Sequence, residues 1–227
     1  MFLTEFDVNT GRRAARHLLG SRERIHAAVL GCFPPGQSSD ESTRTLWRLD
    51  HVSSHAVKLL IVSPLRPDLT ALNEQAGWTT GSSGRTADYG PFLHQLEVGQ
   101  MWRFRLTANP VSARRGEDAP KGTRGKRVAH VTAQQQADWL ASRAERLGVT
   151  FPEDEVGVPR FAVTGREIAQ FRRGSSGEGR RVTLAVTQYD GVVAVADPEK
   201  LRSALMLGIG AGKGYGCGLM TLAPLRR

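Results

Sequence analysis

Alternating apolar and polar residues predict a strand at the start of the chain. In residues 2–8, Phe2, Phe6 and Val8 fall on one face, and Glu5 and Asp7 fall on the other. The pattern then changes to a helical period. It predicts a short basic helix from Thr10 to Gly20, then a second helix that Ser21 caps, with a buried face of Ile25, Ala28, Val29 and Cys32.

The first half continues with short strand-like segments. Residues 45–50 and 56–63 read as strands, and the second is apolar enough to be central in a sheet. Residues 67–75 predict a short helix, and the Gly/Ser/Thr-rich residues 77–91 predict a mobile loop. Residues 101–108 alternate between large apolar side chains and Arg or Thr, so we expect a strand that closes this half.

A similar order of elements follows a Pro-, Gly- and Arg-rich connection. The pattern predicts a strand at 127–131, a helix at 133–147 capped by Thr132, strands at 160–172 and 181–188, a tight turn at Tyr189-Asp190-Gly191 into a strand at 192–196, a helix from Asp197-Pro198 to Leu207, and a last strand at 215–222. This order fits an α+β chain of two tandem ferredoxin-like (split βαβ) domains. We expect domains at residues 1–109 and 126–227, with residues 110–125 as the linker.

The charge balance indicates a polyanionic partner. The 227 residues include 31 Lys and Arg against 22 Asp and Glu, a net charge of +9, while a hydrophobic fraction of 40% leaves enough apolar residues for buried cores. Nucleic acid is the expected partner ahead of a membrane, and a merely solubilising cationic surface is the alternative. No apolar run approaches the roughly 20 residues that span a bilayer, so no membrane partner is expected.

The basic residues are clustered. Residues 103–127 contain eight Lys and Arg against Glu117 and Asp118, a local net charge of 8 − 2 = +6. A second cluster brackets the small-residue stretch 174–179, and a third covers residues 12–24. Most members are arginines, whose guanidinium groups suit bidentate contacts with phosphate. The two cysteines, Cys32 and Cys217, lack metal-like spacing, and with no signal peptide at residues 1–8 we expect a cytoplasmic protein with reduced cysteines.

Glycine occupies every second position from Gly208 to Gly218. This segment follows a predicted helix and precedes a strand, which is the reverse of a dinucleotide-binding loop. Lys213 is followed by Gly214 rather than Ser or Thr, so the segment is not a Walker phosphate loop either. It predicts a loop whose backbone approaches a ligand closely and presents N–H groups and one lysine to phosphate. A turn that serves only chain geometry is the alternative.

His26 is the candidate for proton transfer. It lies on a predicted helix one turn after Arg22, in the most basic part of the first half. An imidazole beside cations suits acid–base chemistry near neutral pH, while an ordinary half-buried histidine is the alternative. His51 and His55 lie on a strand-like segment without a third ligand at useful spacing, so we do not expect a zinc site there.

Five stretches of the chain form a recognisable combination: Met1–Thr4, the histidine-containing segment Arg22–Phe33, Trp102–Pro110, Gly125–Val128 with the helix that contains Trp139, and the ending Gly208–Pro224. Together they resemble the CasE family of CRISPR-associated endoribonucleases. The Phe-Arg-Leu-x-Ala-Asn-Pro run at 104–110 and the glycine-rich ending with Leu-x-x-Leu-Ala-Pro are specific in combination, and the stretches extend over nearly the whole chain.

The resemblance implies two tandem ferredoxin-like domains and an RNA substrate. The substrate would be the stem-loop of a CRISPR repeat, cut at the 3′ base of the stem by the RNA's own 2′-hydroxyl without metal or added cofactor. The products would be a 2′,3′-cyclic phosphate and a 5′-hydroxyl. The enzyme would keep the stem-loop product and join other protein subunits in the Cascade complex.

The resemblance also implies roles for particular residues. His26 matches the catalytic histidine, whereas Glu23 stands where the family pattern has a tyrosine. Glu23 would orient His26, a neighbour would replace the tyrosine, or catalysis would be weaker. The candidates for catalytic support are Arg22, Arg24, Lys213 and Tyr215. The candidates for RNA binding are Lys126, Arg127, Arg172, Arg173, Arg180, Arg181, Gly210, Gly212, Lys213 and Gly214. Two alternatives remain: an RNA-binding scaffold that has lost cleavage, and an unrelated RNA-modifying protein on the same fold.

Overall fold

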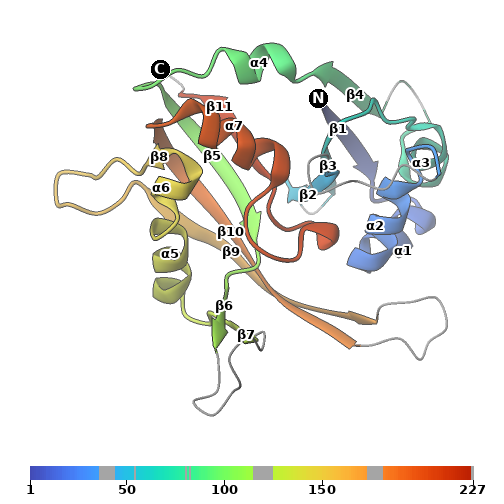
Figure 1. Cartoon of the computed structure of the whole chain (residues 1–227). Helices are drawn as coiled ribbons and strands as arrows, with labels where there is room; N and C mark the ends of the chain where they lie inside the picture. The colour runs from blue at the N-terminus through green and yellow to red at the C-terminus, as the bar shows by residue number, and fades with distance from the viewer. Residues whose placement is uncertain are drawn as a thin grey trace.

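The computed structural model describes residues 1–35, 44–53, 55–79, 81, 83–114, 125–172 and 181–225. The fold is mixed α+β, with two main sheets and helices packed on them (Figure 1). The elements in chain order are β1 (Phe2–Asn9), α1 (Arg13–Leu19), α2 (Arg22–Leu30), β2 (Leu46–His51), β3 (Ala56–Ser63), α3 (Thr70–Ala76), β4 (Gly84–Asp88), α4 (Gly90–His94), β5 (Met101–Ala108), β6 (Val111–Arg114), β7 (Lys126–Ala129), α5 (Ala133–Ala141), α6 (Ala144–Leu147), β8 (Val149–Thr150), β9 (Phe161–Arg172), β10 (Arg181–Val195), α7 (Pro198–Leu207), the short 3-10 helix η1 (Lys213–Tyr215) and β11 (Met220–Pro224).

The first sheet has the strand order β2-β3-β1-β4, and every neighbouring pair is antiparallel. One face carries Phe6, Trp47 and Ile61, which pack in a buried cluster with side chains of α1, α2 and α3. The alternation that predicted the strand at residues 2–8 therefore reflects a real division between faces. This packing fixes α2 on the sheet through its buried residues Ile25 and Val29.

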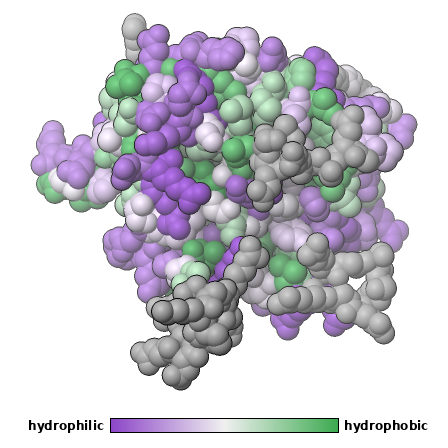
Figure 2. Space-filling view, in the orientation of Figure 1, coloured by the Kyte–Doolittle hydropathy of each residue, from purple (hydrophilic) through white to green (hydrophobic). Residues whose placement is uncertain are grey.

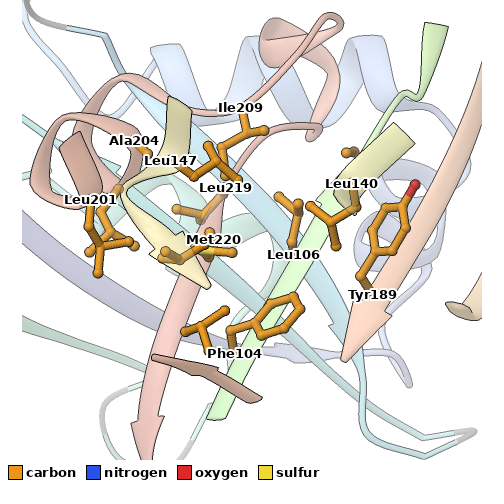
Figure 3. Packing of buried hydrophobic residues seen from close by; sticks show 14 of the residues in the cluster. Phe104, Leu106, Leu140, Leu147, Tyr189, Leu201, Ala204, Ile209, Leu219 and Met220 are labelled. Atoms are coloured by element: carbon orange, nitrogen blue, oxygen red, sulfur yellow. The ribbon is translucent and has the colours of Figure 1, made fainter. Parts of the chain in front are cut away.

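The second sheet has the order β11-β5-β10-β8, and β9 also pairs with β10. In its core, strand residues pack against side chains of α5, α6 and α7. Figure 3 shows Leu106 of β5, Leu140 of α5 and Leu201 of α7 in this cluster. Leu46 and Val62, from the other face of the first sheet, belong to the same cluster. The two sheets therefore share one apolar core between them.

Arg48 ties the two sheets together inside that contact. Its side chain is almost wholly buried, and its Nε and Nη2 donate to the two carboxylate oxygens of Asp50 at 2.7 and 2.9 Å. Nη1 donates to the carbonyl oxygens of Arg105 (2.8 Å) and Leu219 (3.2 Å), and Nη2 also donates to Thr221 Oγ1 (2.8 Å). A strand of the first sheet is thus bonded to two strands of the second.

β5 differs from the expectation. We predicted that residues 101–108 close the first half, but this strand pairs with β10 and β11 in the second sheet. The predicted connection also begins with a strand, because β6 pairs with β7 across it. The strand prediction itself was right; periodicity identifies a strand but does not identify its partner.

The described part of residues 77–91 also has more regular structure than predicted. Within this part, β4 pairs with β1, and α4 begins at Gly90. A Cβ on Gly84 would lie 2.3 Å from Leu69 Cδ1 and 3.3 Å from the ring of Phe6. The small residue there allows close packing, so the prediction of a mobile loop was wrong for this segment.

Three further predictions are corrected within the second half. The helix expected at 133–147 is two helices, α5 and α6, separated at Ser142 and Arg143. Asp190-Gly191 is not a turn, because β10 runs through it, and a Cβ on Gly191 would lie 2.4 Å from Phe161 Cβ. The last strand begins at Met220 rather than residue 215, after left-handed residues at Gly216 and Gly218.

Both cysteines are buried, and neither forms a disulfide in the structure. Burial raises the pKa of Cys32 to about 11 and that of Cys217 to about 12, so neither thiol ionises readily. No helix in the described ranges is long and apolar enough to cross a bilayer.

Candidate active site

The candidate site forms where α2 meets the glycine-rich loop after α7. Ile25 and Val29 face the core, which turns Arg22 and His26 toward this loop. Figure 1 shows the loop, in red, reaching from the end of α7 toward α2. A Cβ on Gly214 would lie 3.5 to 3.9 Å from three atoms of the His26 ring. The loop backbone is therefore in van der Waals contact with the half-buried imidazole.

Tyr215 completes the surroundings of His26. The two ring centroids are 5.9 Å apart at an interplanar angle of 64°, an edge-to-face arrangement. On its other side Tyr215 packs against Phe171 of β9, with centroids 4.7 Å apart. A phenol thus lies between the imidazole and the long β9–β10 hairpin.

Glycine geometry holds the loop against α2. Gly212 and Gly216 have φ of +80° and +75°, the left-handed region that favours glycine. A Cβ on Gly216 would lie 2.4 Å from the Trp47 ring, so only glycine fits there. The Trp47 indole N–H donates to the Gly214 carbonyl oxygen at 3.2 Å. A buried tryptophan of β2 therefore fixes the residue that touches His26.

Arg22 links three elements beneath the site. Its Nη1 donates to the Tyr215 carbonyl oxygen at 3.0 Å, and its Nη2 forms an ion pair with Glu167 of β9 at 3.0 Å. These bonds use Nη1 and Nη2, and the Arg22 side chain is 13% exposed. The arginine that we predicted as catalytic support lies in the site, and its contacts hold the loop and β9 to α2.

Two other predicted neighbours are placed differently. Arg24 donates toward the ring nitrogens of His17, at 3.0 and 3.2 Å, on the side of α2 that faces α1. It is not among the groups that meet His26. Glu23 has one carboxylate oxygen buried without a hydrogen bond to any described residue.

Lys213 points away from His26. Its ammonium donates to the Leu207 carbonyl oxygen at 2.6 Å. Burial, and then the positive charges of Arg44 and Arg146, lower the pKa of Lys213. The amides of Tyr215 and Cys217 both donate to the Gly212 carbonyl oxygen, at 2.8 and 3.4 Å, so these two loop N–H groups are already used within the loop.

The predicted RNA-binding residues that the structure describes lie in three places: the β9–β10 hairpin, β7 and the glycine-rich loop. Arg172 and Arg181 are exposed and face each other across the end of the β9–β10 hairpin, and Arg181 also donates to Gln170 Oε1. Arg173, Arg180 and the stretch 174–179 lie outside the described residues. Lys126 begins β7, and Arg127, exposed, follows it. Gly210 has φ of +78° and packs on the Trp139 ring, and Gly212 and Gly214 belong to the loop already described.

A cleft of about 820 Å³ opens on the far side of this loop. It is lined by residues 208–211 of the loop and by basic side chains from several segments. No acidic residue is among the described residues that line it. The sequence reasoning missed Arg44, Arg143, Arg146 and Lys200. The only local signal was the spacing of Arg143 and Arg146, which are one helical turn apart.

Within the described ranges, no group of three or more His, Cys, Asp or Glu side chains is arranged to hold a metal ion. Among the described residues, the site brings together an imidazole, a phenol, a guanidinium and a glycine-rich backbone.

Comparison with known proteins identifies the class. A family model described as CRISPR associated protein matches residues 1–224. CRISPR-associated endoribonuclease Cse3 of Thermus thermophilus is 31% identical over 227 residues, 99% of this chain and all of the relative. CRISPR system Cascade subunit CasE of Escherichia coli K12 is 29% identical over 135 residues, 58% of this chain and 62% of the relative. A structure of CRISPR endoribonuclease Cse3 bound to a 19 nt RNA has a TM-score of 0.79 and 30% identity, covering 99% of this chain and 100% of that chain.

Fold and site therefore define a CRISPR-associated protein. The full-length match narrows this class: the chain belongs to the Cse3/CasE (Cas6e) family of CRISPR-associated endoribonucleases, which supplies a subunit of the type I-E Cascade complex. The family resemblance inferred from the sequence is confirmed.

Proposed function

We propose that this chain is a metal-independent endoribonuclease that binds the stem-loop of a CRISPR repeat RNA and cuts at the 3′ base of the stem. The observation that carries the proposal is the contact of His26 with Gly214 and Tyr215, which unites the predicted histidine with the glycine-rich loop. A relative named as an endoribonuclease, with 31% identity along its whole length, supports the same activity.

The proposed reaction uses the RNA's own 2′-hydroxyl. A base removes the 2′-proton, the 2′-oxygen attacks the adjacent phosphorus, and the bond from phosphorus to the 5′-oxygen breaks. An acid then protonates that oxygen. The products are a 2′,3′-cyclic phosphate and a 5′-hydroxyl, so the protons balance and no water is consumed. His26 acts as the base, the acid or both, since imidazole titrates near neutral pH.

Tyr215 is the best-placed substitute for the tyrosine that the family pattern has at the position of Glu23. Its ring is edge-on to His26, whereas Arg24 is turned to His17 and Arg22 is bonded to a carbonyl and a carboxylate. A phenol both donates and accepts hydrogen bonds, so Tyr215 can hold a phosphate oxygen or the attacking hydroxyl. Lys213 then contributes positive charge from the cleft side of the loop.

The RNA stem would lie along the β9–β10 hairpin. Arg172 and Arg181 flank its tip, and Phe171 connects it to Tyr215. A-form RNA hides its base edges in a deep, narrow groove, so recognition would depend on shape and on phosphates. We propose that tandem ferredoxin-like domains carry this surface. We further propose that the stem-loop product stays bound while the protein joins other Cascade subunits in the cytoplasm.

The test is cleavage of a cognate repeat hairpin in EDTA. We expect the wild type to cut all-ribose RNA but not RNA with a 2′-deoxy sugar at the cut. His26→Ala should lower the single-turnover rate by about 10²–10⁴ while RNA affinity persists. His17→Ala is the matched control, because His17 lies on α1 beside Arg24. Cutting that survives His26→Ala and the 2′-deoxy sugar would refute the mechanism.

A non-cleaving scaffold of the same complex is the second candidate. The observation that favours it is Glu23, a carboxylate that repels phosphate and cannot donate as a phenol does. Tight binding of the hairpin by the wild type without any cut in the same assay would establish the scaffold instead.

A further inference from the structure

The cleft beyond the glycine-rich loop is a basic hollow of about 820 Å³. Its walls come from segments far apart in the sequence: the start of β2, β7, α5 to α6, and α7. Figure 2 shows hydrophilic residues gathered over α6 and α7 on this face. Six cationic side chains line the cleft: Arg44, Arg127, Arg143, Arg146, Lys200 and Lys213.

Five of these six cations have no carboxylate partner among the described residues, unlike basic residues elsewhere in the protein. Arg105 pairs with Asp190 at 2.6 Å, and Lys58 pairs with Glu5 at 2.7 Å. In the cleft only Lys200 has a carboxylate of the described chain within 4 Å, that of Asp197 at 3.5 Å. Such an uncompensated group of charges attracts an anion, because ligand charge replaces the missing carboxylates.

The electrostatics inside the cleft agree with this reading. Burial, followed by repulsion from Arg44 and Arg146, lowers the pKa of Lys213. Burial, followed by repulsion from Arg146, also lowers the pKa of Arg143. A bound phosphate would raise both pKa values, since an opposite charge favours the protonated form.

The floor of the cleft suits an extended strand. Trp139 lies beneath it, with the Arg143 guanidinium 4.0 Å from the ring centroid. Gly208 and Gly210 present backbone instead of side chains along one wall. A narrow basic groove with bare backbone follows the phosphates of one strand, whereas a duplex presents its phosphates on the outside of a wide cylinder.

The cleft also begins next to the candidate active site. Lys213 lines the cleft, and the next residue, Gly214, touches His26. An RNA strand that leaves the site at Gly214 therefore reaches the cleft at the neighbouring residue, Lys213. The β9–β10 hairpin, which we assign to the stem, contacts α2 through Glu167 on the other side of Tyr215.

We propose that this cleft binds the phosphates of a single-stranded RNA flank at the base of the stem. The proposal rests on the proposed function, since it assumes that the stem-loop is the substrate. It adds a second binding site, made chiefly by four residues outside the sequence-based predictions: Arg44, Arg143, Arg146 and Lys200. The flank on the 5′ side of the stem and the flank on the 3′ side share the chemistry that the cleft recognises.

The experiment compares three hairpin RNAs, each with a 2′-deoxy sugar at the cut: one without flanks, one with a 5′ flank and one with a 3′ flank. Binding to the full-length protein is measured across a range of salt. The test variant is Arg44→Gln/Arg146→Gln. The control is Arg66→Gln/Arg160→Gln, which removes two charges from exposed arginines outside the cleft.

We expect the wild type to bind one flanked RNA more tightly than the flankless RNA. The test variant should weaken that binding about tenfold at 0.1 M salt and lower its salt slope by about 1.4, which is two single-strand phosphate contacts. Its affinity for the flankless hairpin and its thermal unfolding should match the wild type. The RNA that loses affinity identifies the flank.

Equal losses for flanked and flankless RNA, or equal losses in the control variant, would overturn the proposal. Flanks that add no affinity to a hairpin that is bound, and that is cut in its all-ribose form, would overturn it as well and leave the ribonuclease proposal intact. A hairpin that the wild type does not bind at all would instead overturn the proposed function. Arg143→Gln, on the floor of the cleft, provides a second variant with the same expected pattern.

Discussion

Arg48 and Arg22 make similar contacts in very different surroundings. Each comes from the first half of the chain and donates to a backbone carbonyl of the last segment, Leu219 for Arg48 and Tyr215 for Arg22. Arg48 is buried and bonds to both oxygens of a carboxylate, two carbonyls and a hydroxyl. Arg22 is partly exposed, and its carboxylate partner Glu167 is 58% exposed.

The difference indicates that Arg48 stabilises the fold, whereas Arg22 supports the geometry of the site. A buried charge that loses its partners is strongly destabilising, so Arg48 fixes the two sheets in one arrangement. The carboxylate partner of Arg22 is well exposed, so losing that ion pair costs little folding free energy. Its effect should fall on the geometry of Tyr215 and His26.

The largest effect on stability is expected at Arg48. Arg48→Met leaves Asp50 buried, with the Arg105 guanidinium at 3.7 Å as its remaining ion-pair contact among the described residues. We expect the free energy of unfolding to fall by about 3–5 kcal/mol in urea titrations. Arg48→Met/Asp50→Leu should recover part of that loss. A fall below about 1 kcal/mol in the single variant would contradict the structural role.

The next largest effect on stability is expected at Gly216. It separates the cost of the backbone conformation from the cost of packing against Trp47. Gly216 and Gly99 both have positive φ, but a Cβ on Gly99 meets nothing within 4 Å. Gly99→Ala should lower the free energy of unfolding by about 1–2 kcal/mol, because a residue with a Cβ is disfavoured in the left-handed backbone conformation. Gly216→Ala should cost at least about 1 kcal/mol more, since its methyl group overlaps Trp47, and it should also slow cleavage. Equal losses in stability would mean that Trp47 moves aside freely.

Arg22 should matter more for cleavage than for stability. Arg22→Met removes the bonds to Tyr215 and Glu167, and we expect about a tenfold lower cleavage rate at saturating RNA, or about 1.4 kcal/mol. Arg24→Met is the matched control on the same helix, because its partner is His17. An equal loss in both variants would point to general weakening of α2 rather than to support of the site.

The smallest effect is expected at Glu167. Glu167→Gln removes the charge from an exposed partner of Arg22, and exposed ion pairs contribute about 0–1 kcal/mol. Cleavage should change by less than about twofold. A loss as large as that of Arg22→Met would show that the ion pair, rather than the bond to the Tyr215 carbonyl, supports the site.

Local signals in the sequence predicted local structure. Thr132 makes the capping box of α5 with Gln135, and Asp197 caps α7 just before Pro198. Ser21 is the N-cap residue of α2, although its side chain makes no capping hydrogen bond. Such signals involve residues within one turn of each other, so they survive in any tertiary context.

Signals that depend on distant contacts were misread. Asp190-Gly191 has the composition of a turn, yet Asp190 receives a hydrogen bond from Arg105 and Gly191 makes room for Phe161. Sequence reasoning proposed His26 and the glycine-rich loop, which the structure brings into contact. It did not point to Arg44 or Arg143, because the cleft that they line is assembled from separate segments. The division into two domains with a linker at residues 110–125 stays a prediction.

The place of β5 has a consequence for synthesis of the chain. Its neighbours in the sheet, β10 and β11, are translated much later, from residues 181–195 and 220–224. A growing chain therefore exposes both edges of an apolar strand until the ribosome has nearly finished, and pairing over such sequence separation is slow. The nascent protein should need chaperone protection during this interval, and separately expressed halves should be insoluble.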